Sequence, residues 1–212
     1  MTDTTATTPT GPESTAKPSK TLDLIAAGYV VAAAGLVAFL TVNGMPVPEP
    51  ATGVTILLIT LGLLLPPAGM FAFRRILDGD KTAARNGLLL EGSGLIVLLL
   101  GVVLAVSLSS LTGYLVGAIF IAGSAASALL GAVLLRRRHS DIGLGGLREL
   151  NYLVLGTALI FSGAAVIMAS NIAFFYFISQ VQNTVYVDIG ATVIAWGCTL
   201  GAYSFFLASH LR

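Results

Sequence analysis

Glu91 is the side chain whose type and position most suggest chemistry, because it is an acid within the long apolar stretch Gly87–Leu108. It lies about one helical turn into that stretch. An acid inside a membrane span is costly and marks a functional site by default. One interpretation is an intramembrane proton or cation site. The other, which we expect from the four basic residues in the preceding gap, is a carboxylate at headgroup depth or paired with Arg74, Arg75 or Arg85.

The remaining polar residues do not form a catalytic pattern. The segment Asp78–Arg85 resembles part of the CDP-alcohol phosphotransferase motif, but its spacing differs and the downstream acids that would hold a metal are missing. Glu91-Gly-Ser-Gly94 lacks the rhomboid protease pattern, and both histidines lie outside the apolar stretches, where they cannot serve as a base for a buried serine. We therefore expect no enzyme activity, and no catalytic, cofactor-binding or metal-ligating residues.

The composition requires a lipid environment. The chain has 212 residues, of which 56% are hydrophobic and 10% charged, whereas soluble domains carry about 25% charged residues. Its mean hydropathy is +0.91. The net charge of +1 gives no reason to expect nucleic-acid binding. Cys198 is the sole cysteine, so no disulfide can form within the chain.

Six apolar stretches have the length of transmembrane helices. About 20 residues are needed to cross about 30 Å of hydrocarbon at 1.5 Å per residue. Each must be helical, since a helix satisfies its own backbone groups in lipid. The sequence thus predicts an all-α, polytopic membrane protein with spans at Leu22–Val42, Val54–Phe73, Gly87–Leu108, Tyr114–Leu135, Asn151–Phe174 and Val185–Ala208.

The basic residues occur only in alternate gaps between these stretches, which predicts the topology. By the positive-inside rule, both termini are cytoplasmic and the protein is a multi-pass component of the plasma membrane. The three consecutive arginines after the fourth stretch also favour contact with anionic lipid headgroups. The eleven basic residues are Lys17, Lys20, Arg74, Arg75, Lys81, Arg85, Arg136, Arg137, Arg138, Arg148 and Arg212.

Two parts of the chain differ in character. Residues 1–20 are rich in Thr, Ser and Pro and are expected to be disordered. Residues 21–212 are expected to form a single six-helix transmembrane domain. Within it, Pro66-Pro67 predicts a static kink in the second span. Asp188 is interpreted as an acid in the first turn of the last span, where the helix dipole favours it.

A glycine spacing repeats in the first, third and fifth spans. Glycines seven residues apart return to nearly the same helix face and allow a neighbouring backbone to approach closely. The spacing predicts three tandem helical hairpins, at about residues 22–75, 87–138 and 151–212, whose odd-numbered spans meet along the glycine faces at the centre of the bundle. The three pairs are Gly28 and Gly35, Gly94 and Gly101, and Gly156 and Gly163.

Three tandem hairpins with this glycine spacing and short outer turns resemble the HdeD-type small membrane proteins. The resemblance covers residues 22–212 in architecture and is clearest over residues 87–138. That family is linked to bacterial acid resistance, so the resemblance implies a stress-related role. The resemblance assigns no functional residues to this chain. The third hairpin departs from the pattern, because its outer end is aromatic and it lacks the basic pair that ends the other two.

The resulting hypothesis is a non-enzymatic integral membrane protein with a structural or stress-related role. It would act as a subunit of a larger assembly, with other proteins or further copies of itself as partners. The alternative is a small transporter or channel that uses Glu91 as a proton or cation site. That alternative requires a water-accessible polar path from Glu91 to the outer face, and the sequence offers few polar side chains to line one.

Overall fold

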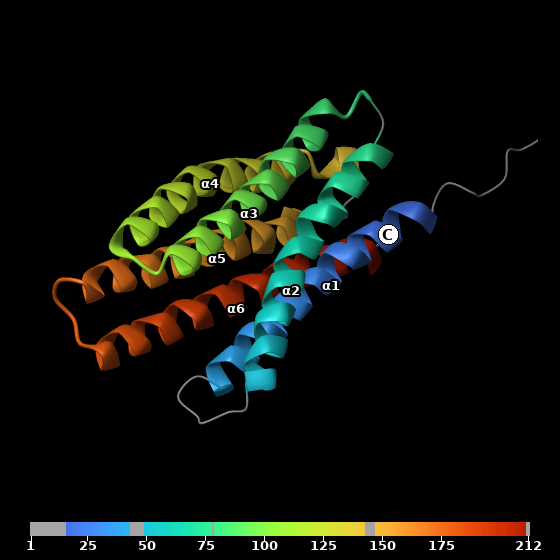
Figure 1. Ribbon diagram of the computed structural model, residues 1–212. Coiled ribbons are helices and arrows are strands. Elements are labelled where there is room, and N and C mark those ends of the chain that lie inside the picture. Colours follow the sequence, from blue (N-terminus) through green and yellow to red (C-terminus); the bar gives the residue numbers. More distant parts are fainter. Residues whose placement is uncertain (1–15, 43–48, 78, 143–146, 211–212) are drawn as a thin grey trace, which may run out of the picture.

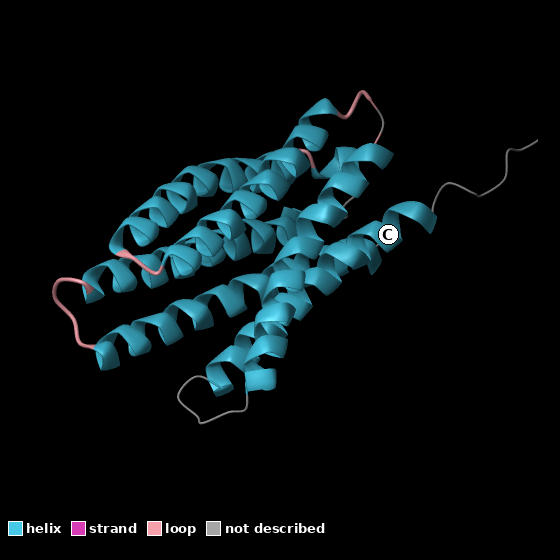
Figure 2. Ribbon diagram, viewed as in Figure 1, coloured by secondary structure: helices cyan, strands magenta, loops and turns pink. Residues whose placement is uncertain are grey.

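The computed structural model describes the chain except for residues 1–15, 43–48, 78, 143–146 and 211–212. The described residues form α-helices joined by short connections, with no strand among them (Figures 1 and 2). The all-α fold with six membrane-spanning helices is therefore confirmed. The elements are α1 (Ala16–Val42), α2 (Glu49–Ile76), α3 (Thr82–Leu108), α4 (Leu111–Arg137), the short 3₁₀ helix η1 (His139–Ile142), α5 (Leu147–Phe174) and α6 (Gln180–His210).

All six α-helices are long and apolar enough to cross a membrane. They begin earlier than the apolar stretches, because a helix continues into polar sequence where its ends meet water or headgroups. Helix α1 begins at Ala16, within the segment 1–20 that was expected to be disordered, while residues 1–15 lie outside the described residues. Helix α6 begins at Gln180, which places Asp188 in its third turn and corrects the first-turn interpretation.

The turn between α3 and α4 shows how a hairpin closes in two residues. Ser109 ends α3 in the left-handed region, with φ of 41°, and its N–H donates to the Ala105 carbonyl at 3.1 Å. Ser110 caps α4, because its hydroxyl oxygen accepts a 3.2 Å hydrogen bond from the Gly113 N–H. These caps satisfy backbone groups that would otherwise be left unpaired at the membrane interface.

The helices follow one another around a closed ring. Each packs against its neighbour in the chain, and α6 returns to pack against α1. The most extensive contacts lie within the pairs α1–α2, α3–α4 and α5–α6, which are the three hairpins. The alternation brings the start of α1, the ends of α2 and α4, and the end of α6 to one end of the bundle, which we call the basic end (Figure 1). The opposite end, with the turns inside each hairpin, is the hairpin end.

Pro66 and Pro67, which were expected to kink the second span, lie inside α2, and α2 is a continuous helix from Glu49 to Ile76. The proline ring is accommodated by a glycine on the neighbouring helix. A Cβ atom added at Gly28 would lie only 2.6 Å from Pro66 Cδ. The absence of a side chain at Gly28 therefore allows α1 to pass directly over the proline.

Helices α1, α3 and α5 bury matching positions. Counted from the first glycine of each pair, the residues six before, three before, one after and four after are all buried. This regular inner face places one charged residue, Glu91, among apolar neighbours in the shared core. The four sets are Leu22, Leu88 and Leu150; Ile25, Glu91 and Leu153; Tyr29, Leu95 and Thr157; and Ala32, Leu98 and Ile160.

Candidate functional site

The repeated glycines lie inside the hairpins. A Cβ atom added at Gly94 would lie 2.9 Å from the Ser124 carbonyl oxygen of α4, and one at Gly156 would lie 2.7 Å from the Gly197 carbonyl oxygen of α6. Gly163 likewise packs against α6. The nearest atoms to all six glycines belong to the second helix of the same hairpin. We call these three contacts the glycine seams; their remaining members are Gly28 and Gly35 against α2, and Gly101 against α4.

The expectation that the odd-numbered helices meet along their glycine faces is therefore wrong. The physical reason is the short connection within each hairpin, which makes its two helices immediate antiparallel neighbours. Their backbones approach closely enough that a Cβ at Gly94 would also lie 2.9 Å from the Ala128 backbone nitrogen. Close backbone approach is what small residues provide in membranes, where apolar side chains gain little from leaving lipid.

Glu91 lies in the core between hairpins. Its side chain is 0% exposed. The Thr157 hydroxyl of α5 donates to Glu91 Oε1 at 3.2 Å, and the same hydroxyl is 2.9 Å from the Leu153 carbonyl oxygen. One hydroxyl hydrogen cannot serve both acceptors fully. Glu91 Oε2 is also buried and has no hydrogen-bond partner.

This arrangement corrects the expected environment of Glu91. Its hydrogen bond goes to Thr157 and not to a basic residue. Helix α3 starts at Thr82, so Glu91 is nine residues in, about 13 Å along the helix axis rather than one turn. Arg85 lies six residues earlier, which at about 100° per residue places the two side chains about 120° apart around α3. They therefore face different neighbours.

A tyrosine of the first hairpin lies near Glu91. Tyr29 of α1 is fully buried and lies near Glu91 of α3 and Cys198 of α6. The Tyr29 ring stacks on Phe205 of α6, with ring centroids 6.2 Å apart. Its hydroxyl is buried and has no hydrogen-bond partner. We call Glu91, Thr157 and Tyr29 the core polar cluster; it joins residues from all three hairpins.

Sequence reasoning found Glu91 and missed its two neighbours. Thr157 follows the repeat glycine Gly156, and Tyr29 follows Gly28, so the two occupy equivalent positions of the glycine pattern. That alignment is the signal that could have found them. Neither residue is charged, and threonine and tyrosine are ordinary in membrane helices, so composition gave no warning.

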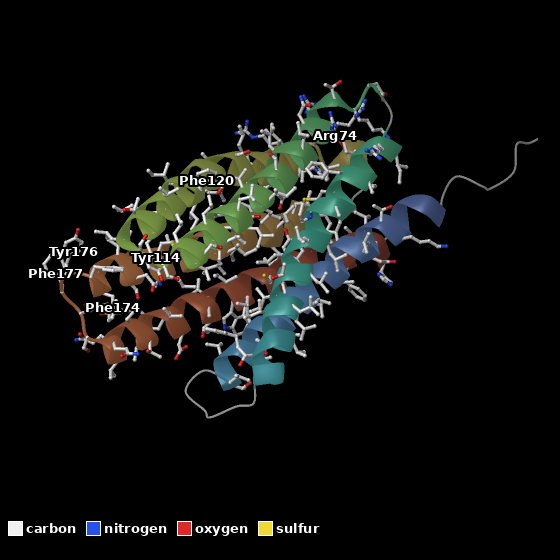
Figure 3. All side chains as sticks on the ribbon, viewed as in Figure 1. Arg74, Tyr114, Phe120, Phe174, Tyr176 and Phe177 are labelled. Carbon is white, nitrogen blue, oxygen red and sulfur yellow. The ribbon has the colours of Figure 1, made fainter. Side chains whose placement is uncertain are left out.

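The two ends of the bundle differ in surface chemistry. At the hairpin end, Phe174, Tyr176 and Phe177 are exposed, and Tyr114 packs against Phe175 with ring centroids 6.1 Å apart (Figure 3). Aromatic side chains of this kind sit at membrane–water interfaces. At the basic end lie Arg74 (Figure 3) and the exposed side chains of Arg136, Arg137 and Arg138.

The comparisons with known proteins do not add a relative. The chain matches no protein-family model, no curated protein and no solved structure. Within the part of the chain that the structure describes, no three His, Cys, Asp or Glu side chains gather as metal ligands would. The core polar cluster is therefore the candidate site that the geometry itself provides.

Proposed function

We propose that this multi-pass membrane protein is non-enzymatic and acts through its packed helical bundle, as a structural or stress-related subunit of a larger membrane assembly of the HdeD-like kind. The observation that supports this most is the closure of the core around Glu91. On the side of the basic end lies the buried set Leu22, Leu88 and Leu150. On the other side lie Ala32, Leu98 and Ile160, so both neighbouring layers are apolar.

Apolar layers on both sides argue against a conducting path through the centre. An ion or water chain needs polar groups or backbone carbonyls along its route. On the inner faces of α1, α3 and α5, Glu91, Thr157 and Tyr29 lie between these two apolar layers. Glu91 thus behaves as a local feature that joins hairpins, and the repeated hairpins supply a rigid body to which partners can attach.

The proposed orientation places both termini in the cytoplasm and the aromatic hairpin end outside. The one-sided distribution of Lys and Arg supports this orientation. The exposed arginines Arg136, Arg137 and Arg138 would then face the anionic headgroups of the inner leaflet.

A second candidate function is a small transporter or channel in which Glu91 binds a proton or cation. The specific observation in its favour is that two buried oxygens, Glu91 Oε2 and the Tyr29 hydroxyl, have no partner. A buried carboxyl group without a basic partner is stabilised by binding a proton or a cation. This candidate needs a rearrangement that opens the apolar layers.

The test is affinity purification in mild detergent, combined with proton-flux measurements on the purified protein in vesicles. We expect other membrane proteins to co-purify in a fixed ratio, with the wild type and with Glu91→Gln alike, and no proton flux above that of empty vesicles. Recovery of the protein alone would contradict the subunit proposal. A flux that Glu91→Gln abolishes would establish the second candidate instead.

A further inference from the structure

Two arginines, Arg74 on α2 and Arg85 on α3, lie near the basic end on the sides of these helices that are turned toward each other. On α3, Gly92 faces α2, since a Cβ added there would lie 3.4 Å from Phe71 and 3.5 Å from Met70. Arg85 is seven residues before Gly92 and therefore lies on the same helix face. On α2, Arg74 is four residues after Met70 and three after Phe71, so it lies on the face turned toward α3.

Neither arginine is neutralised by a side chain that the structure describes. The Nε atoms of Arg74 and Arg85 are both buried and lack a hydrogen-bond partner. The acid expected to pair with them, Glu91, is hydrogen-bonded to Thr157 instead. Asp80 in the intervening turn is exposed, and Asp78 lies outside the described residues.

Two positive charges at one helix contact favour the binding of an anion. Like charges repel, and a buried N–H donor without an acceptor is unfavourable. The start of α3 adds to the positive potential, because helix N-termini attract anions. An anion between the two arginines would relieve both effects.

We propose that Arg74 and Arg85 form a binding site for a phosphate group at the basic end of the α2–α3 contact. The guanidinium fork matches phosphate oxygens and forms two parallel hydrogen bonds to them. Arg74 lies in the last turn of α2 and Arg85 at the start of α3. This is the level at which lipid headgroups lie, so the phosphate belongs either to an anionic phospholipid or to a soluble phosphate. The site is separate from the exposed Arg136–Arg138 surface.

The test measures the unfolding temperature of the delipidated full-length protein in neutral detergent. The probes are phosphatidylglycerol, phosphatidylcholine, and inorganic phosphate against chloride at matched ionic strength. We expect phosphatidylglycerol to raise the unfolding temperature more than phosphatidylcholine does. Arg74→Gln and Arg85→Gln should each weaken this effect by about tenfold in lipid concentration, whereas the control Lys20→Gln, at an exposed position of α1, should leave it unchanged.

The probes distinguish the two sources of phosphate. Stabilisation by phosphatidylglycerol alone assigns the site to a lipid headgroup, and stabilisation by inorganic phosphate as well assigns it to the phosphate group without its chains. Absence of both effects, or an equal loss in Lys20→Gln, would overturn the proposal. If a glutamine variant does not fold, Arg74→Lys is measured in its place. It keeps the charge without the fork, so an intermediate loss is expected, and an unchanged response would also overturn the proposal.

Discussion

The glycine seams and the core polar cluster join helices by opposite means. Within a hairpin, the backbones meet directly, as where Gly156 lies against Gly197. Between hairpins, large or polar side chains fill the contact, as where Thr157 bonds Glu91 and Tyr29 stacks on Phe205. Seams built from backbone contact leave no room for change, whereas side-chain contacts can be altered one group at a time.

This difference indicates a division of roles in the bundle. The seams fix each hairpin as a unit, because a glycine seam requires the whole length of two helices to fit. The core polar cluster contains one residue from each hairpin, so it influences how the three hairpins pack together. Substitutions should therefore have unequal effects in the two regions.

The largest effect is expected at a glycine seam. Gly94→Leu would force a side chain into space held by the Ala128 backbone nitrogen and the Ser124 carbonyl oxygen of α4, both 2.9 Å from an added Cβ. Overpacking against backbone cannot relax by a rotamer change, so we expect a loss of about 3 kcal/mol or more in the free energy of unfolding. Thermal unfolding in detergent measures it.

Gly123 on α4 provides the matched control for that substitution. It is exposed, and a Cβ added there would meet no atom within 4 Å. Gly123→Leu should leave the unfolding temperature within the error of the wild type or raise it slightly, because leucine is a better helix former than glycine. Equal losses at Gly94 and Gly123 would show that the seams are not special.

A smaller effect is expected from Thr157→Val, which removes the hydroxyl that bonds Glu91. The carboxyl group would lose its described partner while its surroundings stay apolar, at a cost of about 1 kcal/mol. The measurement is a double-mutant cycle with Glu91→Leu. The cycle should be non-additive, with Thr157→Val nearly neutral in the Glu91→Leu background; additive losses would show that the two side chains do not act together.

The smallest effect is expected from Tyr29→Phe. This substitution keeps the ring that stacks on Phe205 and removes a buried hydroxyl without a partner. Removing an unpaired polar group is neutral or slightly stabilising, by less than about 1 kcal/mol. A clear loss of stability in the same unfolding assay would mean that the hydroxyl bonds a group near Glu91, such as an internal water molecule.

Most of the fold could be predicted from the sequence. The six helices could be found because each apolar stretch is local and contiguous. The predicted C-terminal ends of the first, third and fifth helices agree with the structure, at Val42, Leu108 and Phe174. The predicted first residues of the helices were less accurate. Helices α1 and α3 begin earlier than expected, at Ala16 and Thr82, because polar residues can extend a helix without changing the apolar pattern that reveals it. The partners of the glycines were predicted wrongly, since periodicity identifies a face and not what it meets.

The candidate site was only partly visible in the sequence. Glu91 was evident because an acid in an apolar stretch is rare. Its environment was not, because four arginines and lysines close by in sequence made local pairing the simplest expectation. The rotation of α3 turned Arg85 toward α2 and Glu91 toward Thr157, and a partner 66 residues away in the chain cannot be found from local pattern.

The sequence alone determined that the chain forms six membrane helices with its basic residues in alternate gaps. In lipid, each helix must satisfy its own backbone hydrogen bonds, so the apolar composition of a segment is enough to identify it as a membrane helix. The tertiary structure alone decided that the glycines join helices within hairpins, that Glu91 meets Thr157, and that Arg74 and Arg85 lie on facing sides of α2 and α3. These pairings depend on how each helix is rotated about its axis. That rotation is set by the fit of all six helices at once.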